Sequence, residues 1–247
     1  MEGPHLLEAL LDAQLLPREV YYQPELLQRT SRGKLLLDRL TSMLGQEQLI
    51  AVNERVIEAL GDVQTSQGVV SVLSLDAFTA PRIRARRPKR KRQILLILDD
   101  IADPGNMGTM LRVALAADVD AVLLTVHCVD CYSPKVVRSA AGAHVALPIE
   151  TDLTWPAIAE KIEPCCRVLV AEAGSVHMYY EQDLTQPFAL IIGNEAHGLS
   201  LQAHALATQT IRIPLSNNVE SLNAAMAAGI ILYEAVRQTH MKLSQNI

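Results

Sequence analysis

Hydrophobic residues along the first 81 positions alternate between helical spacing and short uninterrupted runs. The leucines of residues 5–15 recur on one helical face, and later apolar runs have the length of single strands. Helices are predicted at 5–15, at 26–44 (in two pieces broken near 31–33) and at 54–60, with Asn53 as N-cap, and strands at 20–22, 49–52 and 69–73. This alternation predicts a small α/β domain over residues 1–81.

From residue 93 onward the apolar runs are four or five residues long, as is typical of buried parallel strands. Strands are predicted at 94–98, 121–125, 145–148, 167–171, 189–192 and 210–213. Helices are predicted between or after them, at 109–117, 133–141, 157–162, 201–207 and 221–239. Strand and helix alternate throughout, so residues 93–247 are predicted to form a parallel α/β sheet of about six strands.

Composition bounds the class of protein. Hydrophobic residues make up 49% of the 247 positions, which is enough for a sizeable core. No apolar run approaches the roughly 18 residues of a membrane span, and the first residues lack the charged-then-apolar pattern of an export signal. We therefore expect a soluble cytoplasmic protein without a membrane partner.

The four cysteines allow two interpretations. Cys128 and Cys131 form a CxxC pair, which in other proteins binds zinc or acts as a redox centre. Neither a second CxxC nor a histidine cluster completes a zinc set, so we expect reduced thiols and no metal.

Charge is distributed unevenly. The net charge is −5, yet residues 82–92 hold eight of the 22 basic residues and no acidic residue. Such a segment can be a solvated linker or can contact the phosphates of a nucleic acid, and its charge density on an acidic chain favours the second. The candidate RNA-binding residues of this basic linker are Arg84, Arg86, Arg87, Lys89, Arg90, Lys91 and Arg92.

Three loops rich in Gly, Asn and Ser follow predicted strands, at 103–108, 193–198 and 214–223. Ligands of open α/β sheets bind at the carboxyl ends of strands, so these loops are the candidate binding site. The sequence contains neither GxGxxG after a first strand nor GxxxxGK[ST]. This weighs against a dinucleotide oxidoreductase, a P-loop NTPase and the common methyltransferase fold.

The stretches DPGNMGTMLRVALA (103–116), LIIGNEAHGLS (190–200) and IPLSNNVESLNAAMAAGIILYEA (213–235) resemble, in order and spacing, three motifs of one family. This is the SpoU/TrmH family of S-adenosylmethionine-dependent RNA ribose 2'-O-methyltransferases, in the SPOUT superfamily. The resemblance covers residues 93–247. Residues 1–81 more weakly resemble the small substrate-binding domain of many members, without its opening strand and helix, so this domain is expected to be N-terminally incomplete.

The resemblance implies a trefoil knot in the C-terminal part of the sheet. It also implies a homodimer whose active sites form at the interface. In the last predicted helix, Leu222, Met226, Gly229, Ile230 and Tyr233 recur at helical spacing. This pattern fits a dimer face, and it equally fits burial against the protein's own sheet.

By the same match, five residues are the candidate catalytic set and five others the candidate cofactor-binding set. The catalytic candidates are Asn106, Arg112, Glu195, Ser221 and Asn223. The candidates for binding S-adenosylmethionine, largely through backbone groups, are Gly193, Asn194, Ile213, Pro214 and Leu222.

Several of these roles stay open. Arg112 is the family's usual candidate for activating the hydroxyl, but a guanidinium is a poor base and could instead clamp the target phosphate. Glu195 could hold Arg112 or Asn106, and Ser221 could simply cap a helix. Asn217 stands where the family usually has Gly, and Asn tolerates a left-handed backbone. Among the histidines, only His197 is expected near the site.

The function expected from the resemblance is methylation of a ribose 2'-hydroxyl in structured RNA. Ribosomal RNA is favoured because a separate N-terminal domain is expected to bind RNA. Transfer RNA is an alternative substrate, and a non-catalytic RNA-binding protein on the same fold is the alternative from another class.

Overall fold

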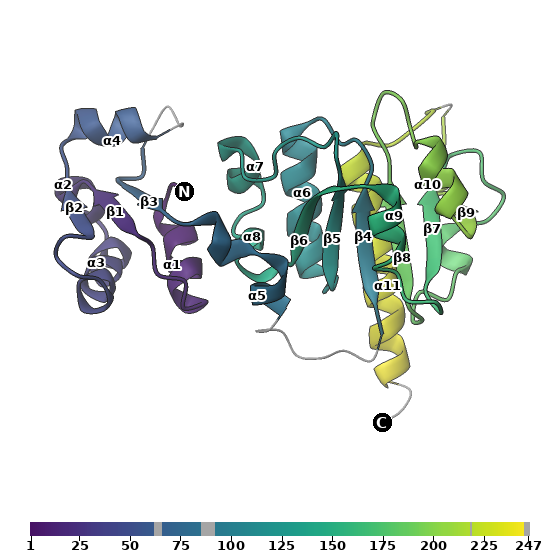
Figure 1. The fold of residues 1–247 in the computed structure, drawn as a ribbon, viewed down its shortest axis with the longest axis horizontal. Helices are drawn as coiled ribbons and strands as arrows, with labels where there is room; N and C mark the ends of the chain where they lie inside the picture. The colour runs from purple at the N-terminus through teal and green to yellow at the C-terminus, as the bar shows by residue number, and fades with distance from the viewer. Residues whose placement is uncertain (62–65, 85–91, 218, 245–247) are drawn as a thin grey trace. The chain divides into compact units, whose positions relative to one another are not determined.

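The structure is a computed structural model that describes residues 1–61, 66–84, 92–217 and 219–244 (Figure 1). The chain divides into two compact units, Met1–Thr79 and Ala80–Ile247. Each unit has its own sheet, and each is described by itself below.

The first unit is built on a three-stranded mixed sheet of order β2-β1-β3. Strand β1 (Glu19–Tyr22) pairs parallel with β2 (Leu49–Ala51) and antiparallel with β3 (Val69–Val72). The helices of this unit are α1 (Pro4–Asp12), α2 (Pro24–Leu27), α3 (Ser31–Met43), α4 (Glu54–Leu60) and the 3-10 turn η1 (Leu75–Phe78). Buried leucines of α1 and α3, such as Leu10 and Leu40, supply much of the core. The prediction of a small α/β domain is confirmed.

Two helix starts in this unit follow from capping side chains. The side chain of Asn53 accepts a hydrogen bond of 3.1 Å from the Val56 amide, which confirms it as the N-cap of α4. Thr30 caps α3 by accepting from the Gly33 amide at 3.0 Å. The break between α2 and α3 therefore lies at residues 28–30, slightly before the predicted position.

The second unit contains a six-stranded parallel sheet of order β6-β5-β4-β8-β7-β9. Its strands are β4 (Ile94–Leu98), β5 (Ala121–Thr125), β6 (Ile149–Leu153), β7 (Arg167–Ala171), β8 (Phe188–Ile192) and β9 (Gln209–Ile211). Its helices are α5 (Ala80–Arg84), α6 (Pro104–Ala116), α7 (Pro134–Ser139), α8 (Ala143–Ala146), α9 (Trp155–Ala159), α10 (Leu201–Leu206), α11 (Ala224–Ser244) and the 3-10 turn η2 (Tyr179–Glu181). The predicted parallel α/β architecture is confirmed.

Helices cover both faces of this sheet, as Figure 1 shows. Successive strand residues point to opposite faces, so Leu96 and Leu98 pack with α6 and α11, whereas Leu95 and Ile97 pack with α9 and α10. All five residues of β4, β5 and β8 are buried. The continuous apolar runs thus reflect strands that are covered on two sides.

Helix α6 is held close to α7 through a glycine. A Cβ at Gly108 would lie 1.8 Å from the Ser139 hydroxyl and 2.8 Å from the Val136 carbonyl oxygen. Only a residue without a side chain permits this approach. The contact fixes the position of α6, and with it the position of Asn106, two residues earlier.

Three predicted boundaries are wrong, each for a local reason. Helix α6 begins at Pro104 and not at residue 109, because Asp103 caps it by accepting from the Asn106 amide at 2.7 Å. The first half of the predicted strand 145–148 lies in α8. The strand itself begins after Pro148, whose carbonyl accepts from Val122 but which has no N–H to donate. Helix α11 begins at Ala224 and not at residue 221.

From β9, at the edge of the sheet, the chain returns through residues 212–223 to α11, which packs on α6 and β8. The trefoil knot implied for this part of the chain stays a prediction. Asn217 has a φ of 59°, so the backbone there is left-handed, as expected where the family usually has Gly.

The CxxC pair lies in the core of the second unit. The Cys128 thiol donates to the Leu98 carbonyl at 3.2 Å, and burial raises the pKa of Cys131 to about 12. These environments keep both groups protonated. Within the described residues, no cluster of three or more potential metal ligands occurs, and no helix is long and apolar enough to cross a membrane.

Candidate active site

The loop that follows β8 is closed on itself. The backbones of Asn194 and Gly198 exchange two hydrogen bonds of 2.9 Å. The Asn194 side chain donates to the Asp100 carbonyl at 2.7 Å and accepts from the Ala196 amide at 2.8 Å. Residues 194–198 therefore form a rigid loop attached to the end of β4.

Gly193 is required at the base of this loop. A Cβ there would lie 2.5 Å from the Gly198 carbonyl oxygen, inside the contact distance of real side chains. The next turn is anchored by the buried Asp99 carboxylate, which accepts from the Ser200 amide at 2.8 Å. Asp99 thus has a structural partner at the end of its strand.

Three polar side chains from distant parts of the chain form one hydrogen-bonded row. The Asn223 Nδ2 donates to the Asn106 Oδ1 at 2.8 Å, and the Asn106 Nδ2 donates to the Glu195 Oε1 at 2.6 Å. These residues precede α11, begin α6 and follow β8, so each of the three predicted loops contributes one of them. Of the two partners proposed for Glu195, the structure shows Asn106.

Asn223 is also the residue that caps α11. Its Oδ1 accepts from the Ala225 and Met226 amides at 3.0 and 3.2 Å. Ser221, the alternative cap, lies before the helix, and its hydroxyl makes no hydrogen bond to any described residue.

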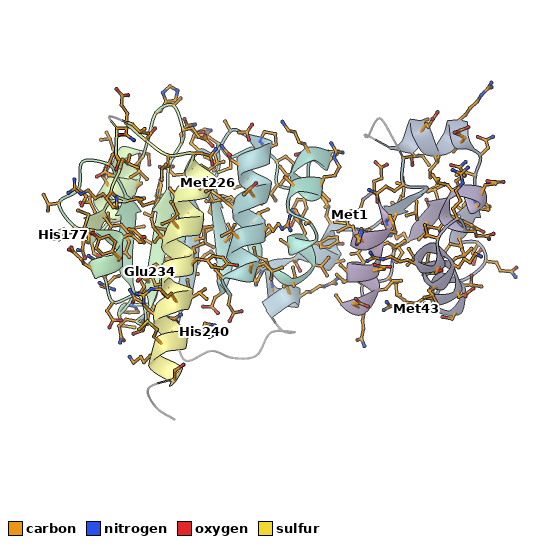
Figure 2. All side chains as sticks on the ribbon, turned by 180° about the vertical axis from the view of Figure 1, so that it is seen from behind. Met1, Met43, His177, Met226, Glu234 and His240 are labelled. Atoms are coloured by element: carbon orange, nitrogen blue, oxygen red, sulfur yellow. The ribbon has the colours of Figure 1, made fainter. Side chains whose placement is uncertain are left out.

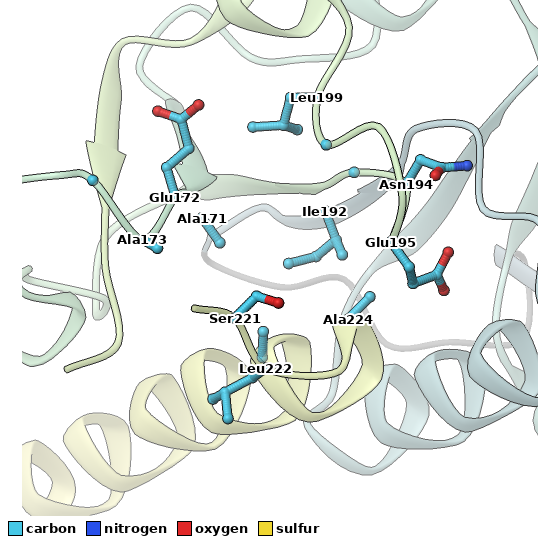
Figure 3. Close-up of a pocket in the computed structure, with 14 residues that line it drawn as sticks. Ala171, Glu172, Ala173, Ile192, Asn194, Glu195, Leu199, Ser221, Leu222 and Ala224 are labelled. Atoms are coloured by element: carbon cyan, nitrogen blue, oxygen red, sulfur yellow. The ribbon is translucent and has the colours of Figure 1, made fainter. Parts of the chain in front are cut away.

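Two clefts meet at this row. The first, of about 560 Å³, runs between the ends of β7 and β8 and the start of α11 (Figure 3). The second, of about 610 Å³, lies over the N-terminus of α6. Both are lined by Asn194, Glu195, Ser221 and Leu222. We call them the β7–β8 cleft and the α6 cleft.

Four of the five predicted catalytic residues line the α6 cleft, and Arg112 does not. Asn106, Glu195, Ser221 and Asn223 lie there together. Arg112 is exposed on α6, lines neither cleft and makes no hydrogen bond or ion pair with any described residue. Its guanidinium is therefore free to meet a group from outside this chain.

The predicted cofactor residues divide in a similar way. Gly193, Asn194 and Leu222 line the β7–β8 cleft, and Ile213 lines a smaller adjoining cavity of about 110 Å³. Pro214 is exposed and lines none of these cavities. His197 lines the α6 cleft, where it was expected near the site.

Sequence reasoning missed one wall of the β7–β8 cleft. This wall consists of Glu172, Ala173 and Gly174, which follow β7, and the opposite side adds Gly198 and Leu199. A signal was present, because residues 167–171 were predicted as a parallel strand, and its carboxyl end is a place where ligands bind.

Most of the basic linker lies outside the described residues, namely Arg86, Arg87, Lys89, Arg90 and Lys91. Arg84 ends α5. The Arg92 guanidinium donates to the Leu184 carbonyl at 2.6 Å and to the Thr239 hydroxyl at 2.8 Å. These two bonds attach the end of the linker to the segment before β8 and to α11, and an RNA contact by the linker stays a prediction.

Comparison with known proteins matches residues 93–233, more than half of the chain, to the SpoU rRNA Methylase family. The chain belongs to this family of RNA methyltransferases. It is 36% identical over 208 residues to an uncharacterized tRNA/rRNA methyltransferase from Synechocystis, covering 84% of this chain and 73% of the relative. It is 33% identical to the mitochondrial rRNA methyltransferase 3A of Danio rerio, covering 98% of this chain and 64% of the relative.

Solved structures agree with this assignment. The SpoU methyltransferase AviRb from Streptomyces viridochromogenes, in complex with AdoMet, superposes with a TM-score of 0.83 at 27% identity, covering 97% of this chain and 89% of that one. An AdoMet-bound rRNA methyltransferase from Sinorhizobium meliloti superposes with a TM-score of 0.77 at 28% identity, covering 96% and 86%. The likeness thus extends over both units of the chain.

Proposed function

We propose that this chain uses S-adenosylmethionine to methylate a ribose 2'-hydroxyl in structured RNA, with ribosomal RNA as the favoured substrate. The observation that carries the proposal is that two clefts meet at Glu195, Ser221 and Leu222. One cleft can hold a methyl donor and the other an acceptor, so the reacting atoms would meet at the shared wall. A 33% identical relative from Streptomyces viridochromogenes is named 23S rRNA (uridine(2479)-2'-O)-methyltransferase.

The β7–β8 cleft fits the proposed cofactor. Its volume of about 560 Å³ lies in the range of small-molecule sites. Ile192, Leu199 and Leu222 offer apolar surface to a purine ring, while Gly193 lets a ligand approach the backbone closely. Glu195 provides negative charge for the cationic end of the ligand.

S-adenosylmethionine, when bound, supplies a methyl group on a positively charged sulfur. The chain's own task is then to orient the ribose in the α6 cleft so that its 2'-oxygen faces that methyl group. The amides of Asn106 and Asn223 can hydrogen-bond the ribose, and Ser221 stands on the wall shared with the donor. Glu195 holds Asn106 in place for this role.

We further propose that Arg112 acts in the site of a partner copy within a homodimer. Helix α11, in front of the sheet in Figure 2, exposes Met226 (58%) and Tyr233 (51%). A Cβ added at Gly229, on the same helical face, would lie 3.9 Å from the Val113 side chain of α6, next to Arg112. Pairing of these helices between two copies would cover the apolar face and bring Arg112 to a target phosphate.

Mixed dimers test this arrangement. Chains carrying Arg112→Ala and chains carrying Asn106→Ala are each expected to be at least about tenfold less active than the wild type on their own. If Arg112 acts across the interface, mixing them equally restores about one quarter of the wild-type sites, because half of the dimers are mixed and each has one intact site. An Arg112 that serves its own chain's site gives no recovery.

The RNA-binding role of the first unit and of the basic linker belongs to the same proposal. Salt dependence of RNA binding should weaken when the linker arginines and lysines are replaced, since each phosphate contact releases counterions. The cytoplasmic localisation stays a prediction, and several relatives are named as mitochondrial.

The direct test is incubation with radiolabelled-methyl S-adenosylmethionine and separated RNA classes, followed by mapping of the labelled ribose. Label as a 2'-O-methyl group in one ribosomal RNA nucleotide supports the proposal. Label in transfer RNA would mean that transfer RNA, and not ribosomal RNA, is the substrate. RNA binding without label, in all unmodified RNA classes, favours a non-catalytic RNA-binding protein.

A further inference from the structure

Glu172 lies in a wall of the β7–β8 cleft and has no part in the proposed methyl transfer. It follows β7 directly, and its amide donates to the Ile211 carbonyl at 2.8 Å, which continues the pairing of β7 with β9. The backbone position of Glu172 is therefore fixed by the sheet. The residue lines both the cleft and the smaller adjoining cavity.

One oxygen of the Glu172 carboxylate is tethered and the other is available. Its Oε1 lies 3.2 Å from the Nε2 of His204 on α10, and the side chain is 34% exposed. The Oε2 accepts no hydrogen bond from any described residue. The pair thus presents a carboxylate oxygen of restricted orientation to whatever fills the cleft.

The two carboxylates of the cleft lie at opposite sides. Figure 3 shows Glu172 and Glu195 with Ile192 between them. Glu195 contacts Asn106 and lines the α6 cleft, whereas Glu172 does not line that cleft. The reacting end of a bound methyl donor must therefore lie at Glu195, which leaves its nucleoside end near Glu172.

A nucleoside brings two neutral ribose hydroxyl groups that need acceptors when they leave water. A carboxylate with a free oxygen is a strong acceptor for them, and acidic side chains serve this purpose in other nucleotide sites of α/β sheets. We propose that Glu172 accepts hydrogen bonds from the ribose hydroxyls of the cofactor's adenosine, with His204 as its positioning residue. This inference rests on the proposed function.

The experiment measures binding by calorimetry, with no RNA present. The probes are S-adenosylmethionine, the neutral 5'-methylthioadenosine, and the 2'-deoxy and 3'-deoxy forms of the latter. The proteins are the wild type, Glu172→Ala, Glu172→Gln, and Glu160→Ala as a matched control, because Glu160 is an exposed carboxylate of the same unit that lines neither cleft.

In the wild type and in Glu160→Ala, loss of one ribose hydroxyl is expected to weaken binding about 10- to 100-fold, the usual effect of a hydrogen bond to a charged group. In Glu172→Ala the parent nucleoside is weakened by a similar factor, and removal of that hydroxyl causes little further loss. Glu172→Gln, which keeps an acceptor but not the charge, lies between. If the effect of removing the hydroxyl depends on whether Glu172 is present, the hydroxyl and the carboxylate are in contact.

Two outcomes overturn the inference. One is an equal loss on hydroxyl removal in the wild type and in Glu172→Ala. The other is a weakened affinity for S-adenosylmethionine alone, with 5'-methylthioadenosine unaffected, which would mean that the carboxylate acts on the positive sulfur. A wild type that binds none of the probes would defeat the proposed function as well, so the two failures are distinguishable.

His204 has its own test. The ratio of affinities for 5'-methylthioadenosine and its deoxy form should fall by a few fold in His204→Ala. In His204→Gln, whose amide can donate to Glu172, this ratio should be restored. A purely structural role for His204 would change the melting temperature without changing that ratio.

Discussion

The two clefts of the second unit are lined by different kinds of residue. The β7–β8 cleft is lined largely by glycines, alanines and apolar side chains at the ends of strands, whereas the α6 cleft is lined by amide, carboxylate and imidazole groups. The first depends on where the backbone runs, and the second depends on which side chains are present. Substitutions should therefore affect donor binding and methyl transfer separately.

The largest expected effect on donor binding is in the β7–β8 cleft, whose shape depends on the backbone. Gly193→Ala places a Cβ 2.5 Å from the Gly198 carbonyl, so the loop must shift. Affinity for S-adenosylmethionine should fall by about 10- to 100-fold or more, in line with the cost of overpacking. Calorimetry measures this, with Gly174→Ala as the matched control, because a Cβ there meets no atom within 4 Å. Equal affinities of the two variants would contradict the comparison.

Arg112→Ala should give the largest effect on turnover, without an effect on donor binding. Loss of a group that holds charge at the reacting centre typically lowers kcat by about 100- to 1000-fold. Affinity for S-adenosylmethionine should stay unchanged, because Arg112 lines neither cleft. Arg112→Lys tests whether the planar guanidinium is needed or charge suffices. Weaker donor binding in Arg112→Ala would show that the two functions are not separable at this residue.

Asn106→Ala should lower kcat by about 10- to 100-fold, because it removes a donor to the Glu195 carboxylate and an acceptor for Asn223. Single-turnover methylation measures this effect, and donor affinity should change little. Thr109→Ala is the control, since Thr109 lies one turn further on α6 and its hydroxyl donates to the Gly105 carbonyl of the same helix. Similar rates for both variants would remove Asn106 from the catalytic set.

Ser221→Ala should have the smallest effect, about 2- to 10-fold, as expected for one neutral hydrogen bond. Ser221 lines both clefts, so this loss is expected in donor affinity and in kcat together. The variant thus tests the wall that the β7–β8 cleft and the α6 cleft share. A loss confined to one of the two quantities would assign the hydroxyl to that cleft.

The same contrast explains what could be predicted from sequence. The side chains proposed to carry chemistry, such as Asn106, Glu195 and Asn223, stand in recognisable motifs, and all three lie in one hydrogen-bonded row. The strands β4, β5 and β7 were predicted to the residue, because a strand covered on both faces must be apolar throughout. The overall α/β architecture followed from the same pattern.

Other features depend on packing that a pattern does not contain. The wall at Glu172–Gly174 forms because the ends of β7 and β8 lie side by side, which is a property of strand order. The starts of α6 and α11 depend on whether Asp103 and Asn223 turn their side chains back to cap them. The apolar residues at 145–148 suggested a strand, but β6 begins only after Pro148.

The capping of α11 by Asn223 gives the polar row a direction. At one end, backbone amides require the Asn223 oxygen, and at the other end the Glu195 carboxylate requires a nitrogen of Asn106. Neither amide can rotate by half a turn without setting donor against donor or oxygen against oxygen. The amide dipoles of the row are therefore held in one orientation. In the proposed reaction they would already be oriented when a ribose binds and would not have to turn during methyl transfer.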